Sequence, residues 1–196
     1  MPRRAVPSHL VSALGLVGSG CGGIELVRQE LVEPFLAKGW TVAVTLTPTA
    51  GSWLAESGEA ELISQITGLP VRVDARSPGE TSPHPPVDCY AVVPASSNTV
   101  AKLALGIADN QALTTVCEAL GGGAVPIVVF PRVNAAHARQ PAWESHIGSL
   151  RRAGVDLVYG DDVWPLHEPR SAPGRPLPWQ AIRTRIESAV SGTDGA

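Results

Sequence analysis

Short apolar runs alternate along this chain with longer segments whose apolar residues recur at helical spacing. Apolar runs of this kind are typical of buried strands, and the helical spacing is typical of helices that cover a sheet. The predicted strands are residues 11–17, 40–46, 71–73, 89–93, 125–130 and 156–160. The predicted helices are residues 24–36, 50–67, 98–120 with a break at 106–110, and 143–153. This alternation predicts parallel strands joined by right-handed crossovers, and hence an open, doubly wound α/β/α sheet.

The pattern changes after residue 160. Residues 161–178 contain many prolines and predict an extended segment, and residues 181–190 predict one further short helix. We therefore expect a domain over residues 1–160 and a proline-rich C-terminal tail over residues 161–196. Residues 76–86 are also rich in proline, serine and glycine, and they predict a loop within the domain.

The composition restricts the partners of the chain. Its net charge is -3 without a basic block, which argues against nucleic-acid binding. No apolar run approaches the length that spans a bilayer. Charged residues make up only 17% of the chain, fewer than a fully exposed surface favours, and this indicates a homo-oligomer.

Cys21, Cys89 and Cys117 are odd in number and form no CxxC pair. This pattern argues against a disulfide framework and against a structural zinc site, so we expect no metal and a reducing, cytoplasmic location. Cys21 precedes a predicted helix, where thiol pKa values fall, and could act as a nucleophile. The alternative is a small buried residue in a tight loop.

Ligands of doubly wound sheets bind at the carboxyl ends of the strands. Three loops at these ends are rich in glycine and hydroxyl residues and enter helices: residues 18–20, 45–49 and "PASSNT" at 94–99. A fourth is "PRVN" at 131–134. Backbone N–H groups, hydroxyls and helix N-termini suit an anionic phosphate. The absence of a P-loop lysine argues against a nucleoside triphosphate.

The stretch "ALGLVGSGCGG", residues 13–23, spaces Gly18, Gly20 and Gly23 as a dinucleotide-binding turn does. An NAD site also requires an acidic residue at the end of the second strand, where this chain has threonines. A ligand with a phosphate but no adenosine ribose therefore fits better, and FMN is the candidate.

The same stretch permits a lipoprotein signal, since two arginines at residues 3–4 precede the apolar run and Cys21 follows it. The apolar run is short for a signal. Gly18 also occupies the place where such signals usually have leucine. We therefore expect residues 11–17 to be a strand.

The segment "VVPASSNTVAKLALGIADNQAL", residues 92–113, resembles the PASANT motif of the homo-oligomeric flavin-containing cysteine decarboxylases and the A-K-x-A-x-G-x-A-D-N-L that follows it. That family includes phosphopantothenoylcysteine decarboxylases and enzymes that oxidatively decarboxylate the C-terminal cysteines of lantibiotic precursors. "TPTAGSWL" at residues 47–54 is similar to the family's T-x-x-A-x-x-F-I segment. The resemblance covers residues 11–160. It implies a flavodoxin-like (Rossmann-like) fold, bound FMN, and trimers or multiples of trimers with flavin sites at subunit interfaces.

The matching positions assign residues to the cofactor. Those implied near the flavin are Gly18, Ser19, Gly20, Thr47, Thr49, Ser96, Ser97, Asn98, Thr99, Ala108 and Asp109. Taken alone, "PASSNT" has a simpler interpretation, in which Ser97 or Asn98 caps a helix. The downstream match favours the flavin site.

The catalytic motifs match less well. The family has a histidine in H-I-x-L-x-x-x-A-D, where this chain keeps Asp88 and has His84 nearby, between prolines. The family's P-x-M-N-x-x-M-W reads "PRVNAAHA" at residues 131–138 and lacks both methionines and the tryptophan. Asn134 could bind a substrate carboxylate or amide, and His137 could exchange protons near neutral pH. These three candidates have structural alternatives: a loop histidine, a helix cap and a surface histidine.

We therefore expect an FMN-binding flavoprotein that oxidatively decarboxylates a cysteine-like small molecule or a peptide ending in cysteine. The alternative is a flavin-binding protein with altered or lost decarboxylase activity, in another redox role or as a partner subunit. A flavin prenyltransferase-like activity is a third option. Arg132 and Arg139 could receive a substrate carboxylate, with a surface role as the alternative.

Overall fold

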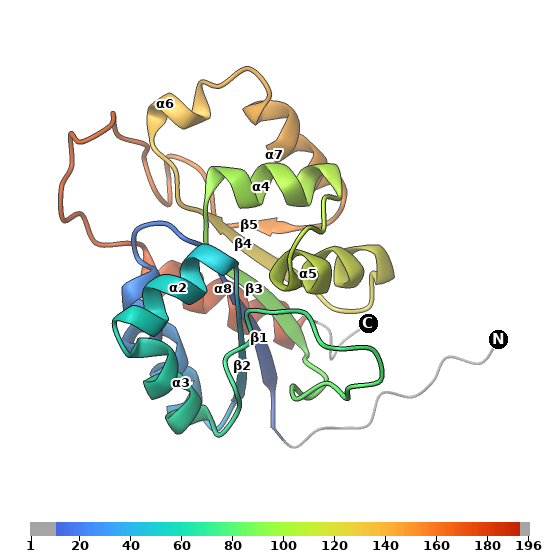
Figure 1. Cartoon of the computed structure of the whole chain (residues 1–196). Coiled ribbons are helices and arrows are strands. Elements are labelled where there is room, and N and C mark those ends of the chain that lie inside the picture. Colours follow the sequence, from blue (N-terminus) through green and yellow to red (C-terminus); the bar gives the residue numbers. More distant parts are fainter. Residues whose placement is uncertain (1–10, 193–196) are drawn as a thin grey trace.

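The computed structural model describes residues 11–192, which form a parallel sheet covered by helices (Figure 1). Within these residues the sheet has five strands in the order β2-β1-β3-β4-β5. The strands are β1 (Ala13–Gly18), β2 (Thr41–Leu46), β3 (Cys89–Ala95), β4 (Ile127–Pro131) and β5 (Asp156–Leu157). This is the flavodoxin-like order, in which the direction of winding reverses between β1 and β3. The predicted fold class is confirmed.

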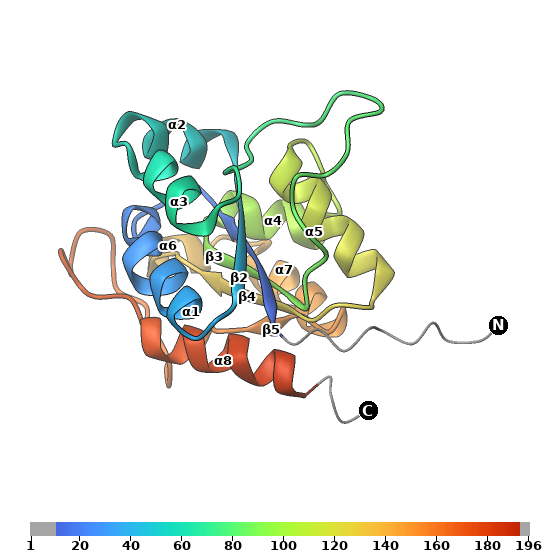
Figure 2. The same ribbon diagram turned by 90° about the horizontal axis from the view of Figure 1, so that it is seen from below.

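Each face of the sheet has its own covering helices. The helices are α1 (Glu33–Ala37), α2 (Pro48–Glu56), α3 (Glu59–Thr67), α4 (Ser97–Leu105), α5 (Gln111–Gly122), α6 (Ala135–Ala138), α7 (Trp143–Arg152) and α8 (Trp179–Ser191). Leu14 and Leu16 of β1 point into an apolar cluster shared with α1, α2, α3 and α8. Val17 points the opposite way, into a cluster shared with α4, α5 and α7, as strand alternation requires. Figure 2 shows α8 beside α1 on the first of these faces.

The segment after β1 is not the single helix that its spacing predicts. A 3-10 turn, η1 (Ile24–Leu26), leads to a π-helical turn, η2 (Arg28–Val32), and then to α1. The cause is Pro34, which has no N–H to donate to the carbonyl of Glu30. That carbonyl instead accepts a hydrogen bond of 2.8 Å from Nη1 of Arg183 on α8. The irregular turn thus connects the N-terminal segment to the C-terminal helix.

Three predicted elements differ from the structure. The helix predicted over 50–67 is divided into α2 and α3 at Gly58, whose φ of 78° lies in the left-handed region. The strand predicted over 71–73 is wrong: among the described residues this segment makes one isolated bridge, between Arg72 and Thr45. Pro70 precedes this bridge and a loop follows it, so the ladder cannot extend. The last predicted strand pairs only over the two residues of β5.

The segment beyond β5 returns to the sheet. Residues 158–178 loop outward beside α6 (Figure 1), and α8 then packs against β3 and β4. Ile182 and Ile186 on α8 are completely buried. No helix between residues 11 and 192 is long and apolar enough to cross a membrane. Residues 3–4, on which the lipoprotein interpretation depends, lie outside the described residues.

Candidate functional site

A hollow of about 380 Å³ opens at the carboxyl edge of the sheet, where β1, β2 and β3 end. It therefore lies at the reversal point between β1 and β3, where a flavodoxin-like sheet binds its ligand. Seven of the residues predicted to contact the flavin line it: Gly20, Thr47, Thr49, Ser96, Asn98, Thr99 and Asp109. The structure thus brings together residues from four separate segments of the chain, which follow β1, β2, β3 and α4, into one hollow.

Three helices begin at this hollow. Their N-caps are Thr47 for α2, Ser96 for α4 and Asn110 for α5. The Ser96 hydroxyl accepts the N–H of Thr99 at 3.2 Å, and the Asn110 side chain accepts the N–H of Leu113 at 3.1 Å. Helix N-termini carry partial positive charge and free N–H groups. Their convergence makes the hollow suitable for a phosphate.

Ser19 joins the loops after β1 and β3. Its hydroxyl donates to the carbonyl of Pro94 at 2.8 Å and accepts the N–H of Ser96 at 2.7 Å. Its side chain is buried and does not line the hollow. Ser19 therefore positions the N-cap of α4, and these two hydrogen bonds are made within the protein.

We expect Ser19→Ala to lower the free energy of unfolding by about 1–3 kcal/mol, because it leaves the partly buried N–H of Ser96 without a partner and removes one of the two hydrogen bonds that the carbonyl of Pro94 accepts. Urea denaturation measures this change. Ser52→Ala, at an exposed position on α2, is the matched control and should change stability by less than about 0.5 kcal/mol. Equal effects of the two substitutions would contradict the role given to Ser19.

The remaining predicted cofactor residues lie outside the lining of the hollow. Gly18 ends β1, and a Cβ there would approach Cδ1 of Ile24 to 2.5 Å, so this glycine permits close packing. Ser97 is the first residue of α4, and Ala108 is exposed in the loop before α5. The N-cap of α4 is Ser96, one residue before the position predicted for a cap.

Lys102 also lines the hollow, although sequence reasoning did not assign it a role. Its Nζ lies 2.5 Å from Oδ2 of Asp109, and this hydrogen bond lowers the pKa of the Asp109 carboxyl. The sequence did contain a signal for Lys102, because Lys102 and Asp109 both lie in the segment that resembles the flavin-containing decarboxylases. The ion pair ties α4 to the loop that leads into α5.

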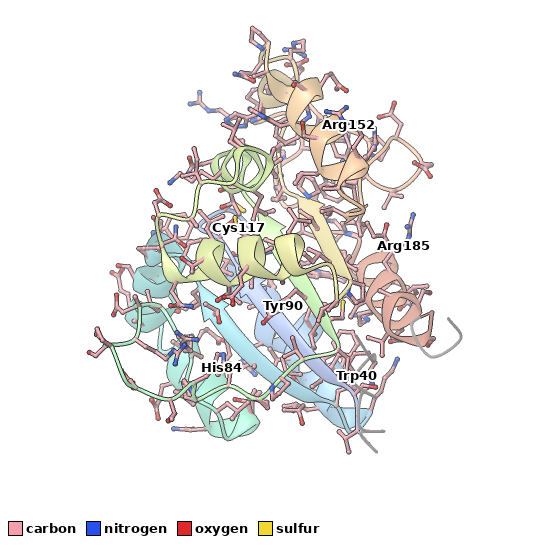
Figure 3. All side chains as sticks on the ribbon, turned by 90° about the vertical axis from the view of Figure 1, so that its right-hand side faces the viewer. Trp40, His84, Tyr90, Cys117, Arg152 and Arg185 are labelled. Carbon is pink, nitrogen blue, oxygen red and sulfur yellow. The ribbon has the colours of Figure 1, made fainter. Side chains whose placement is uncertain are left out.

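His84 lies in a different hollow, of about 160 Å³, over the face of β1 and β2. Figure 3 shows His84 on the loop 76–88 and Tyr90 beneath α5. The His84 ring nitrogen Nε2 is 2.8 Å from the carbonyl oxygen of Pro70. Burial lowers the pKa of His84, which favours the neutral form of its ring. Within one chain this histidine does not line the hollow at the carboxyl edge.

Asn134 and His137 lie at the end of β4. The Asn134 side chain accepts the backbone N–H of His137 at 3.0 Å and so caps the short helix α6. The His137 side chain is on an exposed residue. The structure therefore does not bring His84, Asn134 and His137 together within one chain.

Cys21 is not an activated thiol. Burial raises its pKa to about 11, despite a weak contact with the Ser19 hydroxyl at 3.8 Å. The group is therefore uncharged at neutral pH and is a poor nucleophile. Among the described residues, no group of three or more histidine, cysteine, aspartate or glutamate side chains is placed to hold a metal ion.

The strand order and the anion-suited hollow at the reversal point define a flavodoxin-like protein that binds a phosphate-bearing ligand. The sequence model of the Flavoprotein family matches residues 12–190. The chain belongs to this family.

Several solved structures share the fold. The FMN-dependent cysteine decarboxylase SpaF is 24% identical, with a TM-score of 0.67 over 95% of this chain and 98% of its own. The FMN-dependent cysteine decarboxylase TvaF, from thioviridamide biosynthesis, is 20% identical, with a TM-score of 0.66 over 92% of this chain and 98% of its own.

Two curated relatives match shorter segments. A cysteine/cysteine sulfinic acid decarboxylase from an unknown prokaryotic organism is 32% identical over 36% of this chain and 19% of its own length. The coenzyme A biosynthesis bifunctional protein CoaBC of Thermococcus kodakarensis is 28% identical over 50% of this chain and 23% of its own length. The matched segments thus span about a fifth of these longer relatives.

Proposed function

We propose that the chain binds FMN in the hollow at the carboxyl edge and oxidatively decarboxylates a cysteine-like molecule or a peptide that ends in cysteine. The observation that carries the proposal is the convergence of the N-termini of α2, α4 and α5 on one hollow, in a chain of the Flavoprotein family. The decarboxylase names of SpaF, TvaF and one curated relative support the reaction class.

The residues present fit FMN. The hydroxyls of Thr47, Thr49 and Ser96 and the N–H groups of the helix N-termini would hold the phosphate and the ribityl chain. Gly20 has no side chain, and this leaves its side of the hollow open. A Cβ on Gly20 would approach Cγ2 of Thr49 to 2.6 Å. The Lys102–Asp109 pair leaves no unpaired carboxylate there to repel a phosphate.

In this reaction the cysteine loses a hydride equivalent from Cβ and a proton from sulfur to give a thioaldehyde, and its carboxylate then leaves as carbon dioxide to give an enethiol. FMN, when bound, supplies the two-electron acceptor. Asn134 lies two residues after Arg132, whose backbone N–H donates to the carbonyl of Ala95, and the residue after Ala95 lines the hollow at the carboxyl edge. We assign the side-chain amide nitrogen of Asn134 to substrate binding. His84 and His137 can move protons only where a second copy of the chain brings them to the site.

A homo-oligomer is part of the proposal, with the trimer as its unit. Trp53, Leu105 and Ile107 are large apolar residues that are 47%, 63% and 42% exposed in one chain. Leu105 ends α4, and Ile107 lies in the loop that carries Asp109. A second copy covering them would therefore lie beside the hollow proposed to bind FMN, which we call the flavin hollow. We place the protein in the cytoplasm, where its free thiols stay reduced.

Two measurements test the function. The purified protein should be yellow, with flavin absorption, and should convert peptides ending in cysteine to products that lack carbon dioxide and two hydrogens by mass spectrometry. A colourless protein that takes up no added FMN would overturn the flavin site. A yellow protein that converts no peptide would favour the second candidate, a flavin-binding protein without decarboxylase activity. The observation that favours this second candidate is the substitution of Val133 and Ala138 at the positions where the cysteine decarboxylases have methionine and tryptophan.

A further inference from the structure

A second hollow at the carboxyl edge, of about 260 Å³, carries several cationic side chains. It lies where β4 ends, between α6 and the loop 158–178 that reaches outward beside it (Figure 1). We call it the arginine pocket. The residues of its lining that bear on its chemistry are Arg132, Asn134, Trp164, His167, Arg170 and Arg175.

Two guanidinium groups of this pocket are held against Trp164. The Arg175 guanidinium lies 3.6 Å from the centroid of the Trp164 ring, and that of Arg132 lies 5.6 Å from it. Arg175 also donates from Nη1 to the carbonyl of Pro165 at 2.5 Å. Stacking on an aromatic ring fixes the plane of a guanidinium and leaves its remaining N–H groups free to bind a ligand.

The pocket has more positive charge than the protein neutralises. Among residues 11–192, no carboxylate lies within ion-pair distance of Arg132, Arg170 or Arg175. Glu168 is on the same wall, but both of its oxygens accept hydrogen bonds from Arg139. The Nε atom of Arg132 is buried and has no hydrogen-bond partner. A buried donor without a partner is costly, so the Arg132 guanidinium has hydrogen-bonding capacity that the described residues do not meet.

The arginine pocket adjoins the flavin hollow. The backbone N–H of Arg132 donates to the carbonyl of Ala95 at 2.8 Å, and the next residue, Ser96, lines the flavin hollow. The loop that carries Gly20 also reaches the pocket, because a Cβ on Gly22 would lie 3.9 Å from Nη2 of Arg132. A substrate that reacts at the flavin can therefore extend into the arginine pocket.

Building on the proposed function, we propose that the arginine pocket binds an acidic side chain of the substrate, upstream of its C-terminal cysteine. Arg175 and Arg132 present the forked N–H groups that match a carboxylate. The terminal carboxylate of the cysteine is a poor occupant, because a tight ion pair would stabilise the charged ground state more than the transition state in which that charge leaves. The pocket thus selects peptides with glutamate or aspartate near the terminal cysteine.

The test uses peptide pairs that end in cysteine and differ only in glutamate or glutamine at the first, second or third residue before it. Binding to the holoprotein is measured by calorimetry, which requires no turnover, and conversion is measured by mass spectrometry. We expect one glutamate peptide to bind roughly tenfold more tightly than its glutamine partner. Arg175→Gln should remove this preference without weakening the glutamine peptide, and Arg175→Lys should retain part of it.

Arg152→Gln, on the exposed end of α7, is the matched control and should keep the full preference. The flavin spectrum should be the same in all variants. The proposal is overturned if the unmodified protein binds no peptide or prefers no glutamate peptide, or if Arg175→Gln weakens both members of a pair equally. It is also overturned if Arg175→Gln weakens the binding of peptides with a free terminal carboxylate but not of peptides with an amidated one, whether or not they contain glutamate. That result would show that Arg175 binds the terminal carboxylate. Failure of the decarboxylase proposal is separate, because it appears as binding without conversion.

Discussion

Gly23→Ala should destabilise the protein by roughly 2–6 kcal/mol. Gly23 has φ of 102°, where an L side chain is strained by about 1–3 kcal/mol. A Cβ at this position would also overlap Cδ1 of Leu177, in the segment that leads into α8. Overpacking of this kind adds about 1–3 kcal/mol. Urea denaturation measures the sum.

Gly39→Ala separates the two causes. Gly39 has φ of 80°, but a Cβ there would meet nothing within 4 Å, so only the backbone strain applies. We expect a loss of about 1–2 kcal/mol for this control. Truncating Leu177 should also relieve the overlap. The double variant Gly23→Ala, Leu177→Ala should therefore lose less free energy of unfolding than the two single variants lose together. Additive losses, or equal losses for Gly23→Ala and Gly39→Ala, would show that the overlap with Leu177 has no effect.

Gly20→Ala should weaken FMN binding by roughly ten- to a hundredfold. A Cβ on Gly20 would approach Cγ2 and Cβ of Thr49 to 2.6 and 2.9 Å, and Thr49 is in the first turn of α2. The free protein would relieve this contact by moving that turn away from the hollow. FMN would have to restore it at a cost of about 1–3 kcal/mol, of which each 1.4 kcal/mol is a tenfold loss of affinity.

Gly22→Ala is the control, because a Cβ there would meet only one atom within 4 Å, Nη2 of Arg132 at 3.9 Å. It should leave the FMN affinity unchanged when both proteins are titrated with FMN by flavin absorbance. Unchanged affinity in Gly20→Ala would mean that the loop after β1 does not shape the flavin site. Neither glycine has a positive φ, so backbone strain does not complicate the comparison.

The sequence predicts the sheet well because buried parallel strands are continuous apolar runs. The segments 40–46 and 89–93 are of this kind and form the cores of β2 and β3. The same reasoning fails at residues 71–73. These residues pair with β2 only at the bridge between Arg72 and Thr45, and the local sequence does not show that the pairing stops there. The π-helical turn was also hidden, because it depends on Arg183, far along the chain, as well as on Pro34.

The flavin hollow and the arginine pocket differ in how much of each could be predicted from the sequence. The flavin hollow is built from loops that directly follow strands, so the rule for strand ends is sufficient to place Thr47 and Ser96 at one site. The arginine pocket requires Trp164 and Arg175, which lie in a proline-rich segment without periodicity. Only the folded chain places that segment against Arg132.

The late position of α8 has a consequence for synthesis of the protein. β3 and β4 are translated well before α8, yet α8 covers one face of both strands with Ile182 and Ile186. Until α8 has emerged from the ribosome, that face lacks its cover, and an exposed apolar sheet is prone to association with other nascent chains. The core of this protein therefore closes only after α8 has been made, when this helix packs against strands made long before it.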